Sequence, residues 1–152
     1  MSLIWFDTEF IDDGKTIELI SIGLVREDGA EYYAEPVGVD YSRADLWIKD
    51  NVIAHLTGIT KSRAQIAQEI IEFVGKKPEF WAYYASYDWV ALCQLYGTMM
   101  QLPDGWPMYC RDLKQLRDSK GNPDINVEKG VEHSALDDAR WTKLAYQYVN
   151  GL

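Results

Sequence analysis

Two acids interrupt an apolar segment near the start of the chain, Leu3-Ile4-Trp5-Phe6-Asp7-Thr8-Glu9-Phe10. The bulky and β-branched residues of this segment predict a buried strand. Side chains two residues apart on a strand point to the same face, so the carboxylates of Asp7 and Glu9 are expected to project together. Burying two like charges is unfavourable unless a cation neutralises them. The pair therefore predicts a divalent metal site. In the alternative interpretation, Glu9 begins a loop and Asp7 is a solvated strand end.

A third acid, Asp88, follows another expected strand at residues 79–83. Ser86 is expected to cap a helix that runs through Leu95, and this places Asp88 in the first turn of the helix. The dipole of a helix favours an ionised acid there by a few tenths of a kcal/mol to about 1 kcal/mol. The alternative is therefore that Asp88 is an ordinary first-turn acid with no ligand.

The fourth acid lies on the last expected helix, which begins near His133 and runs to Tyr148. The inward stripe of this helix consists of small or apolar residues and one acid: Ala135, Asp138, Thr142, Ala145 and Val149. The small residues allow the helix to pack close to the sheet, so the carboxylate of Asp138 is expected to point toward Asp7 and Glu9. Asp137 is the neighbouring alternative, but it lies off this stripe and is expected to be solvated.

The elements that position these acids alternate between strands and helices. Three strands come first, at residues 3–10, 16–26 and 31–35, the last two joined by a hairpin turn at Asp28-Gly29. A helix capped by Thr60 and ending at Gly75 precedes the strand at 79–83, and a short strand at 108–110 precedes a helix at 112–118. This order predicts an α/β fold with a mixed central β-sheet flanked by α-helices, and one domain that spans residues 1–152.

Composition restricts the functional class. The net charge of −9, from 15 basic and 24 acidic residues, argues against a broad basic surface for nucleic acid. It is compatible with a nucleic-acid substrate, because bound divalent cations reverse the local sign of an acidic site. The two cysteines, Cys93 and Cys110, form no CxxC motif. This usage indicates a reduced, cytoplasmic protein without a zinc site. Neither a membrane-spanning helix nor a secretory signal is predicted.

Three ordered motifs resemble those of the DEDDh 3′-to-5′ exonucleases, which have the ribonuclease H-like fold. They are Phe6-Asp7-Thr8-Glu9, Tyr87-Asp88-Trp89-Val90-Ala91-Leu92 and His133-Ser134-Ala135-Leu136-Asp137-Asp138-Ala139. Within that group, most of residues 3 to 150 resemble the small bacterial exoribonucleases related to ribonuclease T, best known from mycobacteria. One position departs from the pattern. Tyr84 stands where many relatives have an Asn that helps to position the site or the substrate.

The resemblance implies a role for each matching residue. Asp7 would bridge two Mg²⁺ or Mn²⁺ ions, Glu9 and Asp138 would hold the ion that carries the attacking water, and Asp88 would act on the second ion. Carboxylate and water oxygens are the ligands that these hard cations prefer. His133 would accept the proton of the water. The substrate-binding residues would be Thr8, Phe10 and Tyr84.

The implied reaction is the hydrolysis of single-stranded RNA from its 3′ end to nucleoside 5′-monophosphates, catalysed by a cytoplasmic homodimer. Two alternatives remain: an exonuclease that acts on single-stranded DNA, and an inactive nucleic-acid-binding protein of the same fold. A glycosidase that uses paired acids is disfavoured, because four acids are spread over one strand and two helices.

Overall fold

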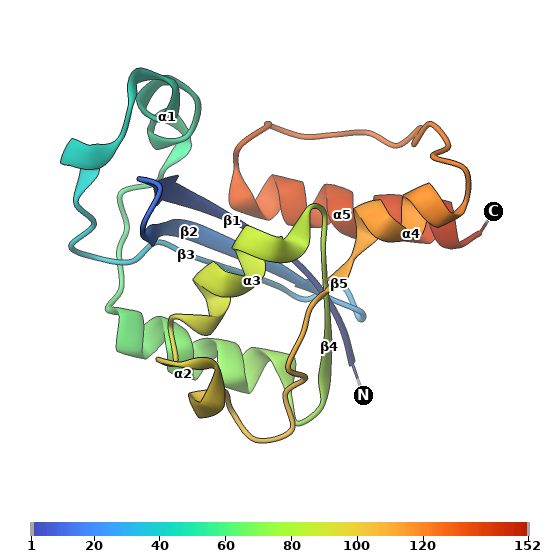
Figure 1. Ribbon diagram of the computed structural model, residues 1–152, viewed down its shortest axis with the longest axis horizontal. Coiled ribbons are helices and arrows are strands. Elements are labelled where there is room, and N and C mark those ends of the chain that lie inside the picture. Colours follow the sequence, from blue (N-terminus) through green and yellow to red (C-terminus); the bar gives the residue numbers. More distant parts are fainter. Residues whose placement is uncertain (1, 152) are drawn as a thin grey trace.

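The computed structural model describes residues 2–151 and contains a five-stranded sheet covered by helices on both faces (Figure 1). The strand order is β3-β2-β1-β4-β5. The strands are β1 (Ser2–Asp12), β2 (Ile17–Arg26), β3 (Glu31–Ala34), β4 (Pro78–Ala82) and β5 (Arg111–Asp112). The first three strands are antiparallel, whereas β4 is parallel to β1 and β5 is parallel to β4. The predicted mixed sheet is therefore confirmed.

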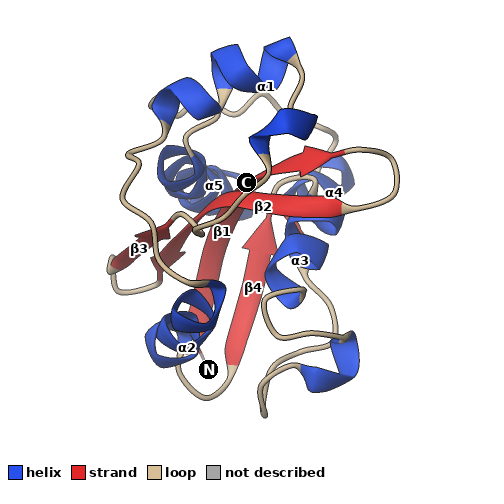
Figure 2. Ribbon diagram, turned by 90° about the vertical axis from the view of Figure 1, so that its left-hand side faces the viewer, coloured by secondary structure: helices blue, strands red, loops and turns tan. Residues whose placement is uncertain are grey.

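Within residues 2–151, five α-helices connect and cover these strands. Figure 2 shows the helices in blue around the red sheet. They are α1 (Leu46–Asn51), α2 (Arg63–Val74), α3 (Ala85–Cys93), α4 (Leu113–Ser119) and α5 (Ala135–Asn150). Short 3-10 turns lie at Tyr41–Arg43, Ile53–His55 and Met99–Gln101. No helix between residues 2 and 151 is long and apolar enough to cross a membrane.

Alternating side chains of β1 divide the core into two layers. Ile4 and Phe6 pack with residues of α2 and α3 on one face of the sheet. Trp5 packs on the other face, with Leu113 of α4 and Ala145 of α5. Because side chains alternate along a strand, Asp7 and Glu9 are on the same face as Trp5, the face that α5 covers. The position of α5 therefore determines which side chains lie next to Asp7 and Glu9.

Three element boundaries differ from those expected. Helix α2 is capped by Ser62, whose Oγ accepts a hydrogen bond from the Gln65 N–H, and not by Thr60. Residue 84 precedes α3 with a left-handed backbone, and Ser86 lies inside the helix. The short edge strand β5 lies at 111–112, because Trp81 and Ala82 of β4 pair with those residues and not with 108–110.

Candidate active site

Strand β1 carries the first two acids side by side on the face that α5 covers. Asp7 pairs with Gly23 of β2, and Glu9 pairs with Ser21. Besides burial, the charge of Glu9 contributes to the raised pKa of Asp7, which agrees with the expectation that the two carboxylates project together. The register then shifts between Glu9 and Phe10, where Ile20 of β2 is skipped, and the pairing continues through Asp12.

Gly23 allows α5 to approach these acids, and the sequence analysis missed its importance. A Cβ atom at this position would lie 2.5 Å from Leu136 Cα and 2.6 Å from Leu136 N. Distances of this kind exclude any side chain, so the backbone at the start of α5 rests directly on β2 beside Asp7. A lone glycine inside the apolar segment of 17–25 was the available signal, because such a glycine often marks a close approach of another backbone.

The start of α5 brings Asp138 and His133 to the site. Ligand atoms of Glu9, His133 and Asp138 lie within 4.8 Å of one another. The Asp138 carboxylate also accepts a hydrogen bond of 3.1 Å from the backbone N–H of His133, whose φ is 64°. The His133 ring meets the ring of Trp47 edge-on, with centroids 4.8 Å apart. The hydrogen bond of the His133 N–H and the contact with Trp47 therefore restrain the imidazole beside Glu9 and Asp138.

Helix α3 brings Asp88 against Thr8, the residue between the two acids of β1. The Asp88 side chain is buried, and its Oδ1 accepts hydrogen bonds from both the backbone N–H and the hydroxyl of Thr8. Because both donors act on Oδ1, the contacts with Thr8 leave Oδ2 available to a ligand. Thr8 was expected to contact the substrate, but it is buried and its hydroxyl is used to hold Asp88.

Burial and mutual repulsion raise the pKa values of the four acids. Burial contributes most to the raised pKa of Asp7, and the charges of Asp88, Glu9 and Asp138 raise it further. Burial also raises the pKa of Glu9 to about 8 and that of Asp88 to about 7, although the hydrogen bonds from Thr8 oppose the second shift. The pKa of Asp138 is raised by burial as well. A cation at this position would oppose these shifts, because it favours the ionised form of a carboxyl group.

Two unpartnered oxygens show that the donor set fits a divalent cation. Among residues 2–151, Asp7 Oδ2 and Asp138 Oδ1 are buried side-chain oxygens without a hydrogen-bond partner. Buried carboxylate oxygens seldom lack a partner, and Mg²⁺ and Mn²⁺ prefer oxygen ligands of this kind. The four acids can therefore hold metal ions, and the tightest group of possible ligands is Glu9, His133 and Asp138.

Asp137 faces away from this cluster, but it is not the solvated residue that was expected. Its carboxylate accepts hydrogen bonds from the Val131 N–H at 3.1 Å and from Arg140 Nη1 at 2.7 Å. Arg140 also makes a two-point ion pair with Glu31 of β3. Asp137 thus ties the segment before His133 to α5 and, through Arg140, to the sheet.

The remaining expected substrate residues, Phe10 and Tyr84, lie in β1 and at the start of α3. The ring of Phe10 contacts Tyr87 of α3, with centroids 5.8 Å apart. Phe10 and Trp47 also line a hollow of about 240 Å³ next to β1. The Tyr84 side chain is 64% exposed at the start of α3. Phe10 is partly exposed and Tyr84 is exposed, so both rings are accessible to a ligand.

Comparisons with known proteins agree with this geometry. The Rv2179c-like 3′-5′ exoribonuclease domain family matches residues 3–150. The 3′-5′ exoribonuclease Rv2179c of Mycobacterium tuberculosis H37Rv is 44% identical over 144 residues, which are 90% of this chain and 86% of the relative. The exoribonuclease MT2234.1 of strain CDC 1551 matches with the same identity and coverage.

Solved structures with little sequence identity share the fold. Escherichia coli exonuclease I in complex with a dT13 oligonucleotide gives a TM-score of 0.66 at 12% identity over 96% of this chain, which spans 40% of that larger chain. The RNase domain of the yeast Pop2 protein gives 0.59 at 11% identity, and the match covers 98% of this chain and 76% of that one. The expected ribonuclease H-like fold is thus confirmed, and the match over residues 3–150 shows that the chain belongs to the Rv2179c-like 3′-5′ exoribonuclease family.

Proposed function

We propose that this protein is a two-metal-ion 3′-to-5′ exoribonuclease that hydrolyses single-stranded RNA from the 3′ end and releases nucleoside 5′-monophosphates. The observation that carries the proposal is the meeting of Glu9 and Asp138 with His133, whose ligand atoms lie within 4.8 Å of one another. The match to an exoribonuclease family over residues 3–150 supports the same reaction.

The proposed cofactor is a pair of Mg²⁺ or Mn²⁺ ions held by Asp7, Glu9, Asp88 and Asp138. The unpartnered oxygens of Asp7 and Asp138 support this assignment. Bound there, the ions would offset the negative charge of the phosphate and of the attacking and leaving oxygens. Burial is the main cause of the raised pKa values of Glu9 and Asp88, and the charge of Asp138 adds to both shifts. A bound cation would oppose these shifts.

His133 is the proposed general base. Its imidazole accepts a proton from the attacking water, the water oxygen bonds to phosphorus, and the bond from phosphorus to the 3′ oxygen breaks. The leaving 3′ oxygen takes up a proton from solvent and becomes the 3′-hydroxyl group of the shortened strand, and the nucleotide leaves with its 5′-phosphate. The hydrogen bond from the His133 N–H to Asp138 and the contact with Trp47 support this role, because they restrain the imidazole beside the acids.

The 3′-terminal nucleotide is proposed to enter between Phe10 and Trp47, which line the hollow of about 240 Å³. A base stacked on an aromatic ring gains about 1–3 kcal/mol, and this grip does not require a basic surface. Tyr84 would contact the next nucleotide from the start of α3. The net charge of −9 limits recognition to a few nucleotides near the 3′ end.

We also propose that the chain acts as one domain of residues 1–152 and that it forms a homodimer in the cytoplasm. The two free cysteines, Cys93 and Cys110, suit a reducing compartment. Light scattering of the purified protein would test the dimer, because a mass of 17.5 kDa would identify a monomer.

The test of the proposed function is degradation of a 5′-labelled single-stranded RNA and of the matching DNA, with Mg²⁺, with Mn²⁺ and with a chelator. A ladder that shortens from the 3′ end, requires the metal and disappears in Asp7→Asn would support the proposal. Asp104→Asn, at an exposed position, is the matched control. A higher rate on DNA would contradict the RNA preference, and intact strands under every condition would contradict the reaction.

A further inference from the structure

Asp112 lies outside the acidic cluster, but its carboxylate accepts three backbone hydrogen bonds. The residue ends β5 and precedes α4. Its Oδ1 accepts hydrogen bonds from the Lys114 N–H at 2.8 Å and the Tyr84 N–H at 3.1 Å, and its Oδ2 accepts one from the Ala85 N–H at 3.2 Å. One side chain thus caps its own helix, α4, and also binds the start of α3, which lies 28 residues earlier in the chain.

The start of α3 needs this external acceptor. Tyr84 has φ 56° and ψ 58°, a left-handed conformation that is unfavourable for a residue with a Cβ atom. Its side chain makes no capping hydrogen bond, so α3 lacks the local cap that the N-terminus of a helix usually has. The two bonds to Asp112 hold this strained turn, because they fix the N–H groups of residue 84 and of the first helical residue.

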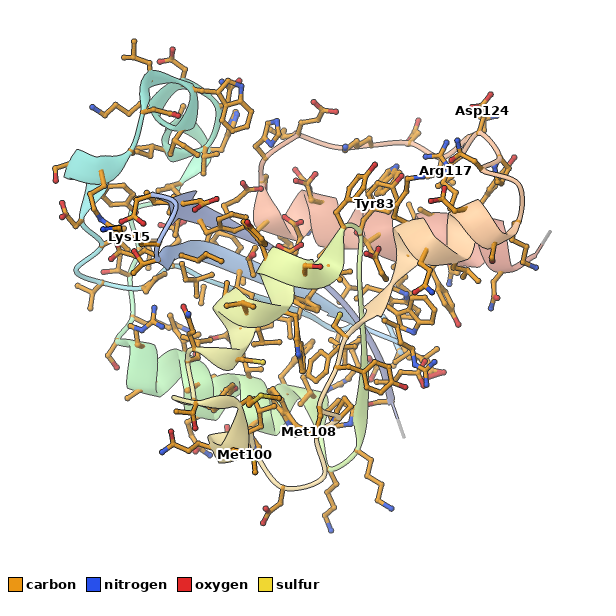
Figure 3. The ribbon with its side chains drawn as sticks, in the orientation of Figure 1. Lys15, Tyr83, Met100, Met108, Arg117 and Asp124 are labelled. Atoms are coloured by element: carbon orange, nitrogen blue, oxygen red, sulfur yellow. The ribbon has the colours of Figure 1, made fainter. Side chains whose placement is uncertain are left out.

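The other end of the same turn reaches the proposed metal site. Asp88 lies in the first turn of α3. Its carboxylate accepts a hydrogen bond of 3.0 Å from the Thr8 N–H and another from the Thr8 hydroxyl. The first turn of α3 is therefore fastened at two points, to β5 by the carboxylate of Asp112 and to β1 by the carboxylate of Asp88. Tyr83, just before this turn, also receives a hydrogen bond of 2.9 Å from Arg117 of α4 (Figure 3).

We propose that Asp112 is a positioning residue of the exonuclease site: by holding the left-handed turn at Tyr84, it sets the placement of Asp88 and the direction in which the Tyr84 ring faces the substrate. This inference rests on the proposed function, in which Asp88 holds metal and Tyr84 meets the second nucleotide. Asp112 touches neither the substrate nor the metal in this role. It acts only through the backbone of α3.

The first experiment measures hydrogen exchange of individual backbone amides by NMR in the metal-free protein. Asp112→Asn replaces one acceptor oxygen with an NH₂ group that cannot accept a hydrogen bond. We expect faster exchange at Tyr84 and Ala85, and also at Thr8, whose N–H is bonded to Asp88. Ser62→Ala is the matched control, because it removes the side-chain cap of another helix, α2. It should leave Thr8 exchange unchanged.

The second experiment measures kcat on RNA for the same variants. A small displacement of a catalytic group lowers a rate strongly, so we expect Asp112→Asn to lower kcat about tenfold or more and Ser62→Ala to change it less than about twofold. The effect of Asp112→Asn should be smaller in a Tyr84→Gly background, because glycine adopts the left-handed conformation without strain. If Asp112→Asn does not fold, Asp112→Glu carries both measurements, since it moves the carboxylate by one methylene.

Unchanged Thr8 exchange in Asp112→Asn, or equal losses of kcat in Asp112→Asn and Ser62→Ala, would overturn the proposal. An identical effect of Asp112→Asn with and without Tyr84→Gly would also overturn it. Failure of the proposed function looks different. The wild-type protein would then leave RNA intact, while the exchange of Thr8 would still report whether Asp112 places Asp88.

Discussion

Gly23 pairs with Asp7 across β1 and β2, and the backbone of α5 lies where a side chain at residue 23 would begin. Gly23 therefore affects the site around Asp7 although it has no side chain of its own. The absence of a Cβ atom at Gly23 brings α5 down onto the sheet, and this contact places Asp138 next to the strand that carries Asp7. The first prediction follows from this contact.

Gly23→Ala should displace the start of α5. The added methyl group would stand 2.5 Å from Leu136 Cα, and overpacking of this kind costs about 1–3 kcal/mol. We expect a lower free energy of unfolding in urea and a loss of exonuclease activity at temperatures where the variant is still folded. Gly151→Ala is the control, because a Cβ there would meet its nearest atom at an ordinary 3.5 Å. Normal activity of Gly23→Ala would contradict the prediction, because it would show that the site functions without the close contact between Gly23 and α5.

Thr8→Val should weaken the site through Asp88. The substitution keeps the shape of the side chain but removes the hydroxyl donor to Asp88 Oδ1, and a hydrogen bond to a charged group is worth about 1.5–3 kcal/mol. We expect a rate about tenfold lower and a higher Mg²⁺ concentration for half-maximal activity. Both are measured in a metal titration. Thr8→Ser keeps the hydroxyl and should restore most of the rate; an equal defect in the serine variant would argue against this role of the hydroxyl.

His133→Ala should lower kcat by about a hundredfold, the size of effect expected when a general base is lost. Asp138→Asn should abolish turnover with the fold retained, because it removes a proposed metal ligand. Steady-state rates on RNA and circular dichroism spectra distinguish loss of chemistry from loss of structure. The exposed substitution Asp104→Asn serves as the control. Near-normal turnover in either site variant would refute the role assigned to that residue.

The stability of the metal-free protein should fall as the pH rises from about 5 to 8. Burial raises the pKa of Glu9 to about 8 and that of Asp88 to about 7, so the folded state retains protons that the unfolded state releases near pH 4. A raised pKa contributes stability that is fully present below the pKa of the unfolded state, and this stability is lost as the pH passes through the folded-state value.

Thermal unfolding in a chelator, at intervals of pH, measures this dependence. Glu9→Gln cannot ionise at residue 9, so its midpoint should fall less over the same range. Mn²⁺ added at pH 8 should raise the midpoint of the wild-type protein, because it binds the ionised carboxylates. A midpoint that stays constant from pH 5 to 8, or the same decline in Glu9→Gln, would contradict the assignment.

Strand spacing and helix periodicity were enough to predict which acids share a face. Asp7 and Glu9 follow the two-residue repeat of β1, and Asp138 follows the inward stripe of α5; both patterns are local and can be read from the sequence. The mixed sheet was predictable for the same reason. The positions of the acids in their elements were thus clearer than the exact ends of those elements.

What the sequence could not reveal depends on contacts between distant segments. The start of α3 was misjudged because its cap comes from Asp112, far along the chain, while Ser86 looked like a local cap. A substrate role for Thr8 was implied by the family resemblance, and nothing in the sequence shows that its hydroxyl donates a hydrogen bond to Asp88. Asp137 looked solvated because its partners, Val131 and Arg140, are identified only by the folded backbone.

The bond between the His133 N–H and the Asp138 carboxylate makes these two residues one unit. A substitution at Asp138 removes a proposed ligand and also releases the backbone that carries the proposed base. The effects of substitutions at the two residues on activity are then epistatic. Once Asp138 has been replaced, a further substitution at His133 lowers the activity little more. A lineage that lost Asp138 could not recover hydrolysis by keeping His133, so inactivation of such a nuclease would take a single step and be difficult to reverse.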